Sequence, residues 1–285
     1  MDKHKAIYIA GTGHSGSTLI DMLIGSSEDV LSLGELSFYN LYKNDISYKK
    51  GTKKYICACG KRFKRCDFWS KISSSIRIKK FYSLKESLYI ILNIFIPQLG
   101  IKKMSDQTNK LIEEIKKHKT FNYVLDSSKD PRRLFLLLEN PALEVYSIVM
   151  MRRAEAVAYS YSRKGRIQKS KNYYLMILQW ILINFLIKKI LKDKKHILVD
   201  YEDFCKYPKK YIRAINRKLG IRIDEDDYLK QINSTAYHNI DGNIMRFKKI
   251  NSVESDDIWK KKITGFKKIY SMAILKITKP LWSSC

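Results

Sequence analysis

The sequence predicts an α/β fold, in which a mostly parallel sheet carries helices on both faces. Short apolar runs rich in β-branched residues alternate along the chain with segments of helical spacing, the pattern of parallel strands joined by helices. A glycine-rich loop at residues 11–18 also stands between the first apolar run and the first helical segment. That order of strand, loop and helix places backbone N–H groups where they bind anions.

The individual elements follow from these periodicities and from the turn residues between them. Strands are predicted at 5–10, 30–33, 121–125, 144–151 and 196–200. Helices are predicted at 19–24, 84–96, 104–118, 132–138, 154–163, 173–190 and 208–219. Residues 43–80, after the second strand, contain three cysteines and show weak periodicity, so we interpret them as an insertion or lid. A polar C-terminal third follows, and residues 1–285 are expected to form one domain.

The net charge is the unusual feature of the composition. The chain has 55 Lys and Arg against 28 Asp and Glu, a net charge of +27, whereas 45% hydrophobic and 12% aromatic residues are typical of a globular protein. Such a field attracts anionic small molecules, polyanions or lipid surfaces, although dispersed, solvated lysines give the same totals. No nucleic-acid partner is expected, because the basic residues are scattered and no nucleic-acid-binding motif is visible.

A cytoplasmic location is expected, because the first apolar run is short and leads into the glycine loop instead of a signal-peptide cleavage site. Two apolar segments bear on membrane contact. Residues 88–96 are too short to span a bilayer, and residues 173–190 are interrupted by two amides and two lysines. We interpret the second segment as a buried or surface-docked helix, and a helix lying on anionic lipid is the alternative.

The loop at 11–18 reads G-T-G-H-S-G-S-T and has the glycines and terminal hydroxyls of a nucleotide-binding phosphate loop. Ser17 stands where that loop has lysine, the residue that reaches the β- and γ-phosphates of a triphosphate. A cradle without this lysine suits a single 5′-phosphoryl group. The predicted fold is therefore P-loop-like, with an altered ligand preference.

Four further segments follow predicted strands. They are Gly34-Glu35, residues 126–130, Arg152-Arg153 and Tyr201-Glu202. Ligands of open α/β sheets bind outside the carboxyl ends of the strands, so these segments are expected to meet the loop there. A phosphate cradle, a carboxylate, a lysine and an arginine then lie together, as group transfer from a phosphate-bearing donor requires.

Several motifs, in order along most of the chain, resemble those of sulfotransferases that use 3′-phosphoadenosine 5′-phosphosulfate (PAPS), in particular bacterial enzymes related to tyrosylprotein sulfotransferases. I-A-G-T-G-H-S-G-S-T-L-I-D resembles their 5′-phosphosulfate loop, V-Y-S-I-V-M-M-R-R-A-E-A-V-A-Y-S their 3′-phosphate strand and helix, and V-L-S-L-G-E-L the segment that carries the catalytic base. D-S-S-K-D-P, D-Y-E-D-F, C-x-C-G with a later C-x-F-W, and H-N-I-D-G-N-I-M-R are also similar to bacterial members.

The resemblance implies PAPS as co-substrate and a hydroxyl acceptor, which includes an anionic glycan, a lipid-linked sugar or a peptide tyrosine. The residues expected to hold the 5′-phosphosulfate are Gly13, His14, Ser15, Gly16, Ser17 and Thr18. Arg152 and Ser160 match the family's 3′-phosphate ligands, and on resemblance alone Tyr201 and Arg246 are expected at the nucleotide. The alternative for Ser160 is a helix-interior serine that bonds its own backbone.

Sulfonate transfer needs positioning and charge stabilisation, and it demands no magnesium, because a sulfonate carries less charge than a phosphoryl group. Glu35 is the candidate general base for the acceptor hydroxyl, and Lys129 and His14 are candidates to neutralise charge on the leaving phosphate. A helix cap or surface ion pair is the alternative for Glu35, and a solvated turn lysine for Lys129.

Two positions depart from the family's pattern. His14 stands where arginine or lysine is usual, and an imidazole is fully charged only below its ordinary pKa of about 6.5. The usual Arg-Asp-Pro-Arg is here Arg152-Arg-Ala-Glu155, so only its first arginine is present. Both changes bear on efficiency and substrate type.

The cysteines are Cys57, Cys59 and Cys66, with Cys205 and Cys285 far along the chain. An odd count in a cytosolic chain fits no simple disulfide framework. A reduced, packed cluster without metal is favoured, and zinc held by the three clustered thiols and a fourth ligand is the alternative.

Two other functions remain open. A lysine-less P-loop kinase or nucleotide hydrolase needs a magnesium carboxylate and a substitute for the missing lysine. A catalytically silent glycan- or membrane-binding protein has no reason to place a base and a cation at the strand ends.

Overall fold

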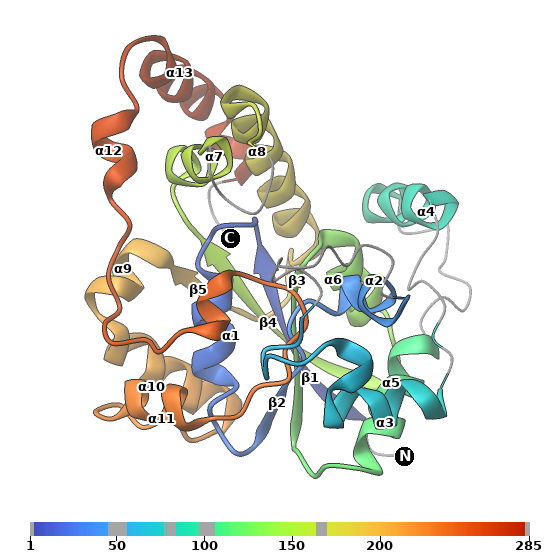
Figure 1. The fold of residues 1–285 in the computed structure, drawn as a ribbon. Coiled ribbons are helices and arrows are strands. Elements are labelled where there is room, and N and C mark those ends of the chain that lie inside the picture. The colour runs from blue at the N-terminus through green and yellow to red at the C-terminus, as the bar shows by residue number, and fades with distance from the viewer. Residues whose placement is uncertain are drawn as a thin grey trace.

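A five-stranded parallel sheet forms the centre of the computed structural model, which describes residues 3–44, 56–76, 78, 84–96, 106–163 and 170–282 (Figure 1). The strands are β1 (His4–Gly11), β2 (Val30–Ser32), β3 (Tyr123–Lys129), β4 (Leu143–Met151) and β5 (His196–Asp200). They lie in the order β2, β3, β1, β4, β5, and every neighbouring pair is parallel. The predicted α/β class and parallel sheet are confirmed.

The side chains of β1 alternate between two cores. Ile7 and Ile9 enter one core, whereas Ala6 and Tyr8 enter the other, and all four are buried. A central parallel strand is covered on both faces, which explains why its sequence is continuously apolar.

Helices cover both faces of the sheet, as predicted (Figure 1). The first face packs against α1 (Ser17–Ile24), α9 (Tyr201–Lys206), α10 (Pro208–Leu219) and α11 (Tyr228–Ser234). The second packs against α3 (Asp67–Ser75), α4 (Leu84–Phe95), α5 (Asp106–Lys116), α6 (Pro131–Leu138) and the end of α8 (Tyr173–Ile190).

The remaining helical elements complete the fold. They are η1 (Leu36–Phe38), α2 (Tyr39–Asn44), η2 (Phe63–Arg65), α7 (Ala154–Ser162), η4 (Ile244–Phe247), α12 (Ile258–Lys262) and α13 (Gly265–Trp282). α7, α8 and α12 share a third core, in which Trp180 and Trp259 are buried.

The structure corrects the prediction for residues 126–129. These residues were expected to begin a turn, but they continue β3, where Asp126 lies opposite Tyr8 and Lys129 opposite Ala10 of β1. Backbone pairing with β1 and buried partners for the polar side chains outweigh the turn preference of Asp and Ser.

The C-terminal third also differs from its expected description as merely polar, since it contains α11, η4, α12 and α13. α13 is largely exposed and rich in lysine, so its apolar periodicity is weak in the sequence. The segment with the three cysteines lies between β2 and β3. Of the predicted insertion, residues 45–55, 77 and 79–80 lie outside the described residues.

Within the described part of the chain, α8 is the one helix that is long and apolar enough, by length and composition, to cross a membrane. Its mean hydropathy is 1.3, but 44% of it is buried inside the structure. Ile177, Trp180 and Ile187 point into the protein, whereas Leu175 and Leu182 are exposed. This packing agrees with the expected buried or surface-docked helix.

Candidate functional site

The glycine-rich loop follows β1 and leads directly into α1. Gly16 has φ of 90° at the N-cap of α1, a left-handed conformation that glycine adopts without strain. The Ser15 hydroxyl is buried and has no hydrogen-bond partner in the described part of the chain. The loop therefore presents a helix N-terminus and an unused hydroxyl, which together suit an anion.

Two tyrosines pack against the glycines of this loop. A Cβ atom on Gly13 would lie 1.9 Å from the hydroxyl oxygen of Tyr161, and one on Gly16 would lie 2.3 Å from Cδ2 of Tyr201. A side chain at either position would therefore displace a tyrosine ring. Tyr201 was predicted at the site, and the structure places its ring there.

Tyr161 is a site residue that the sequence reasoning missed. Its ring makes an edge contact with His14, with ring centroids 4.3 Å apart. Burial, followed by the negative charge of Glu35, raises the pKa of Tyr161 to about 12. The run Y-S-Y-S offered the signal, but Ser160 alone was selected from it. Tyr161 thus packs against the phosphate loop and lies within the electrostatic influence of Glu35.

Arg152 connects the end of β4 to the loop. Its Nη1 donates to the backbone oxygen of His14 at 2.9 Å, and its guanidinium lies 4.4 Å from the ring centroid of Tyr201. Trp180 Nε1 donates to the Arg152 carbonyl at 3.0 Å and fixes the backbone. Arg152 Nε is buried and has no partner among the described residues. Within the described structure, one hydrogen-bond donor of Arg152, the residue predicted to bind the 3′-phosphate, is thus available.

Ser160 is buried in the second turn of α7, in the same strand, loop and helix unit as Arg152. Its predicted contact with a 3′-phosphate stays a prediction.

Glu35 and Lys129 form an ion pair at the carboxyl edge of the sheet. Glu35 follows β2, Lys129 ends β3, and Lys129 Nζ lies 2.5 Å from Glu35 Oε1. Each side chain is only 12% exposed. Two residues predicted independently to be catalytic are thus brought into direct contact.

The environment of Glu35 shifts the pKa of its carboxyl group toward neutral pH. Burial raises the pKa of Glu35 to about 7, and the Lys129 charge opposes that rise without cancelling it. Asp241 raises the pKa further, and Arg246 lowers it. A carboxylate with a pKa near the working pH is suited to general-base catalysis.

The backbone around Lys129 is held by its polar neighbours. Asp126 forms a buried ion pair with Arg133 and accepts hydrogen bonds from the backbone N–H and hydroxyl of Ser128. Asp130 caps α6 by accepting from the Arg132 N–H. Lys129 itself has φ of 65°. The carboxylates of this motif are therefore structural, and the lysine is the member directed at the site.

A segment before η4 forms another wall of the site. A Cβ on Gly242 would lie 3.3 Å from Thr18 Oγ1 and 3.7 Å from both Glu35 Oε1 and Arg246 Nη1. The backbone N–H of Asn243 donates to Thr18 Oγ1 at 3.1 Å. The backbone at Gly242 therefore lies close to Thr18, Glu35 and Arg246.

Arg246 is buried and holds this wall together. It donates to the Ile56 carbonyl at 2.9 Å, to the Tyr42 hydroxyl at 3.2 Å and to the Gly242 carbonyl at 3.3 Å. These bonds place it beside Glu35, and its expected role in closing over a nucleotide stays a prediction.

Solved structures supply the nearest comparison for this arrangement. The sulfotransferase domain of the Synechococcus PCC 7002 olefin synthase is similar at 17% identity and a TM-score of 0.60, with 98% of this chain and 95% of that chain covered. The sulfotransferase domain from the curacin biosynthetic pathway is similar at 15% identity and a TM-score of 0.56, with 98% and 99% covered. The chain has a sulfotransferase fold.

Other comparisons are more distant. Retinol dehydratase in complex with retinol and PAP matches at 12% identity and a TM-score of 0.44, with 98% of this chain and 82% of that chain covered, and at this distance it supports no inference about this chain. No protein-family model matches the sequence, and no curated protein matches it. The activity of this sulfotransferase fold must therefore be argued from its own residues.

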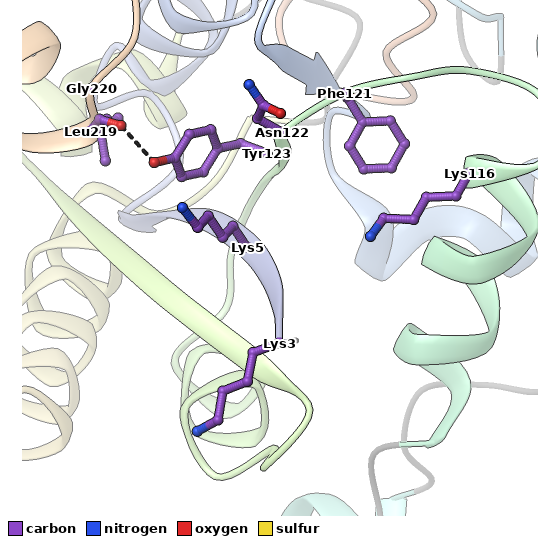
Figure 2. A pocket seen from close by; sticks show the side chains of 8 residues that line it. All are labelled: Lys3, Lys5, Lys116, Phe121, Asn122, Tyr123, Leu219 and Gly220. Atoms are coloured by element: carbon purple, nitrogen blue, oxygen red, sulfur yellow. Dashed lines mark hydrogen bonds between the residues drawn. The ribbon is translucent and has the colours of Figure 1, made fainter. Parts of the chain in front are cut away.

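A basic hollow of about 470 Å³ lies elsewhere on the sulfotransferase fold (Figure 2). Figure 2 shows Lys3, Lys5 and Lys116 among its lining residues, with the Tyr123 hydroxyl donating to the Leu219 carbonyl. Lys5 and Tyr123 are register partners at the amino ends of β1 and β3. The phosphate loop follows the opposite end of β1, so this hollow is separate from the candidate active site.

The clustered cysteines have a partner that was not predicted. The ligand atoms of Cys57, Cys59, Cys66 and His238 all lie within 4.8 Å of one another. His238 is far from the cysteines in the sequence, and no spacing rule connects it to them. The expected all-cysteine cluster was therefore incomplete.

Proposed function

We propose that this protein is an enzyme, a sulfotransferase that moves a sulfonate from PAPS to a hydroxyl acceptor, with Glu35 as general base. One observation carries the proposal. A buried Glu35–Lys129 pair, in which the carboxyl pKa is about 7, lies at the same sheet edge as a phosphate loop without its lysine. The loop binds the phosphosulfate of the donor, and the ion pair receives the proton of the acceptor hydroxyl.

The residues present fit a phosphate-bearing donor. The Ser15 hydroxyl, which has no partner among the described residues, the N-terminus of α1 and the closely packed glycines form an anion cradle. Arg152 has an unused buried Nε and lies against that cradle. We assign the 5′-phosphosulfate to residues 13–18 and the 3′-phosphate to Arg152 and Ser160.

The donor supplies an activated sulfonate, and the chain's own residues handle the proton and the charge. Glu35 Oε accepts the proton of the acceptor hydroxyl as its oxygen attacks sulfur. Lys129 Nζ and the His14 ring stabilise the negative charge that collects on the leaving phosphate. The acceptor is a carbohydrate, a glycolipid or a tyrosine hydroxyl, all of which present such a proton.

The carboxylates near the loop disfavour a kinase or hydrolase. Asp21 accepts from Ser32 Oγ at 2.6 Å and from Asn239 Nδ2 at 2.5 Å, and burial raises its pKa. Asp126 is paired with Arg133. Both oxygens of Asp126 and Oδ1 of Asp21 are thus engaged by other side chains, which disfavours the magnesium carboxylate that nucleotide hydrolysis in P-loop enzymes requires.

The decisive test compares two ligands by thermal unfolding. PAP, the product of the donor, stabilises the folded protein, because a ligand that binds only the native state must raise its melting temperature. ATP with magnesium gives a smaller shift at equal concentration. A larger shift with ATP and magnesium would contradict the assignment of the donor. Incubation with labelled donor and fractionated lysate then identifies the acceptor by the label it acquires.

We further propose a cytoplasmic protein that binds the surface of an anionic membrane through α13 and the exposed side of α8. Phe266, Ile269 and Ile277 of α13 are 65% to 75% exposed. The helix also carries Lys267, Lys268, Lys276 and Lys279 and contains no acidic residue. Exposed apolar groups interleaved with lysines are typical of helices that lie on anionic lipid.

Vesicle sedimentation tests the lipid proposal. The protein should sediment with phosphatidylserine-containing vesicles and not with pure phosphatidylcholine vesicles. Double substitution of Ile269→Glu and Ile277→Glu should abolish this binding, while Tyr207→Glu, an exposed position on another face, should not. Equal sedimentation of both variants, or none for the parent protein, would refute the proposal.

A further inference from the structure

Cys57, Cys59 and His238 surround Cys66 closely enough for the four side chains to bind one metal ion. Cys66 Sγ lies 3.6 Å from the sulfur of Cys57 and 3.6 Å from that of Cys59. Nδ1 of His238 lies 3.2 Å from Cys66 Sγ and 3.8 Å from Cys57 Sγ. Since a disulfide needs an S–S separation of about 2.05 Å, all three thiols are reduced.

These separations match zinc. Ligand distances of about 2.3 Å for Zn–S and about 2.0–2.1 Å for Zn–N place tetrahedral sulfurs about 3.8 Å apart and sulfur and nitrogen about 3.5 Å apart. We propose that Cys57, Cys59, Cys66 and His238 bind one structural zinc ion. Three thiolates and an imidazole are a donor set that zinc prefers, and four protein ligands leave no open position for catalysis.

The surrounding backbone is built to hold these ligands in place. Cys57 and Cys59 lie on a tight turn in which the Gly60 N–H donates to the Cys57 carbonyl at 2.9 Å, and Gly60 has φ of 83°. Cys66 is the N-cap residue of α3. Both ends of the cysteine segment are thus fixed before any metal binds.

The histidine is oriented by aromatic neighbours. Trp69 Nε1 donates to the His238 carbonyl at 2.6 Å, and the Phe68 ring stacks on the imidazole at 5.2 Å between centroids. Such outer contacts fix the ring of a metal-binding histidine. Cys57 and Cys66 are fully buried, while Cys59 is exposed and gives a metal ion access.

Zinc at this position joins two distant parts of the chain. The cysteines lie between β2 and β3, whereas His238 precedes the segment that forms a wall of the candidate active site. Next to the cluster, the Ala58 N–H donates to the Asn239 carbonyl at 3.0 Å, and Ile240 in turn bonds the residues on either side of Gly34. The metal therefore links the cysteine segment to residues 238–240, which hold the turn before Glu35, and this inference does not depend on the proposed reaction.

Metal analysis of the full-length protein tests the proposal. After incubation with zinc and removal of the excess, we expect about one zinc per chain by mass spectrometry of the metal. Cys66→Ser and His238→Ala should lose it, and Cys205→Ser, at a cysteine outside the cluster, should retain it. Chelation of the parent protein should lower its melting temperature, and zinc should restore it.

Cobalt provides a readout that does not depend on a variant folding. The parent protein loaded with Co²⁺ should show the intense visible bands of a tetrahedral ion and thiolate charge transfer in the near ultraviolet. Protein that takes up less than about a tenth of an equivalent of zinc, iron bound in place of zinc, or equal zinc in the Cys66→Ser and Cys205→Ser variants would overturn the proposal.

Discussion

Substitution of Lys129→Met tests whether the ion pair at the sheet edge sets the acidity of the base. Methionine has a similar length and keeps the backbone conformation available to lysine, but it removes the charge that lies 2.5 Å from Glu35. Lys129 lowers the pKa of Glu35, which burial has raised to about 7. Its removal must therefore raise that pKa further and shift the active range toward higher pH.

The size of the effect follows from the burial of the pair. Both side chains are 12% exposed, so solvent screens their interaction only weakly. A cation within hydrogen-bond distance lowers a carboxyl pKa by about one to three pH units. With a pKa of about 7, the Glu35 carboxyl group titrates near neutral pH, and a rise of one pH unit in that pKa lowers the ionised fraction at pH 7 about fivefold.

The assay is the pH dependence of kcat/KM for sulfonate transfer, which reports groups of the free enzyme. In the parent protein the rate should rise about tenfold per pH unit at low pH and level off above about pH 7. In the variant the plateau should move to higher pH, and a constant deficit at high pH measures the separate role of Lys129 in stabilising the leaving group. The exposed Lys218→Met serves as control. An unchanged midpoint in Lys129→Met would refute the coupling.

Three further outcomes are expected. Glu35→Gln should lower kcat by about 10²-fold or more while PAP still raises the melting temperature, whereas the exposed Glu28→Gln should keep both the parental kcat and the stabilisation by PAP; retained turnover in Glu35→Gln would remove Glu35 from the mechanism. Arg152→Ala should weaken the binding of PAP about tenfold more than the binding of adenosine 5′-phosphate, whereas Arg153→Ala should show no such difference. Equal losses of affinity for the two ligands, measured by calorimetry, would contradict a 3′-phosphate role for Arg152. Gly13→Ala should abolish PAP binding in the same titration, because its methyl group meets a tyrosine hydroxyl at 1.9 Å; normal affinity would exclude a tight cradle.

Much of the site could be predicted because its parts follow strands. Glu35, Lys129 and Arg152 come at or directly after the ends of β2, β3 and β4, and parallel strands bring their carboxyl ends to one edge. The local sequence pattern was therefore enough to predict that these three residues lie together. The contact between Glu35 and Lys129 needed in addition the order of the strands, in which β2 and β3 are neighbours.

The residues that were missed lie where no local rule applies. His238 meets the cysteines through a separation of 172 residues from Cys66, which no ligand-spacing pattern spans. Tyr161 lies beside a correctly selected serine, but its direction depends on how α7 packs over the loop. α13 has a mixed apolar and basic surface, so its helical period was not recognised.

The position of Glu35, the candidate base, depends on contacts with Ile240, which lies far away in the sequence. The Glu35 N–H donates to the Ile240 carbonyl at 2.8 Å, and the Ile240 N–H donates to the Leu33 carbonyl at 3.1 Å, so residue 240 holds the turn at Gly34 from outside the sheet. Gly34 has φ of 73°, and its Cβ would lie 2.4 Å from the Ile240 carbonyl oxygen, so only glycine permits this approach. A carboxylate on a tight turn keeps its orientation only if that turn is braced. The segment from His238 to Ile240 supplies the brace, which explains why a cluster of thiols distant from the chemistry bears on the geometry of the base.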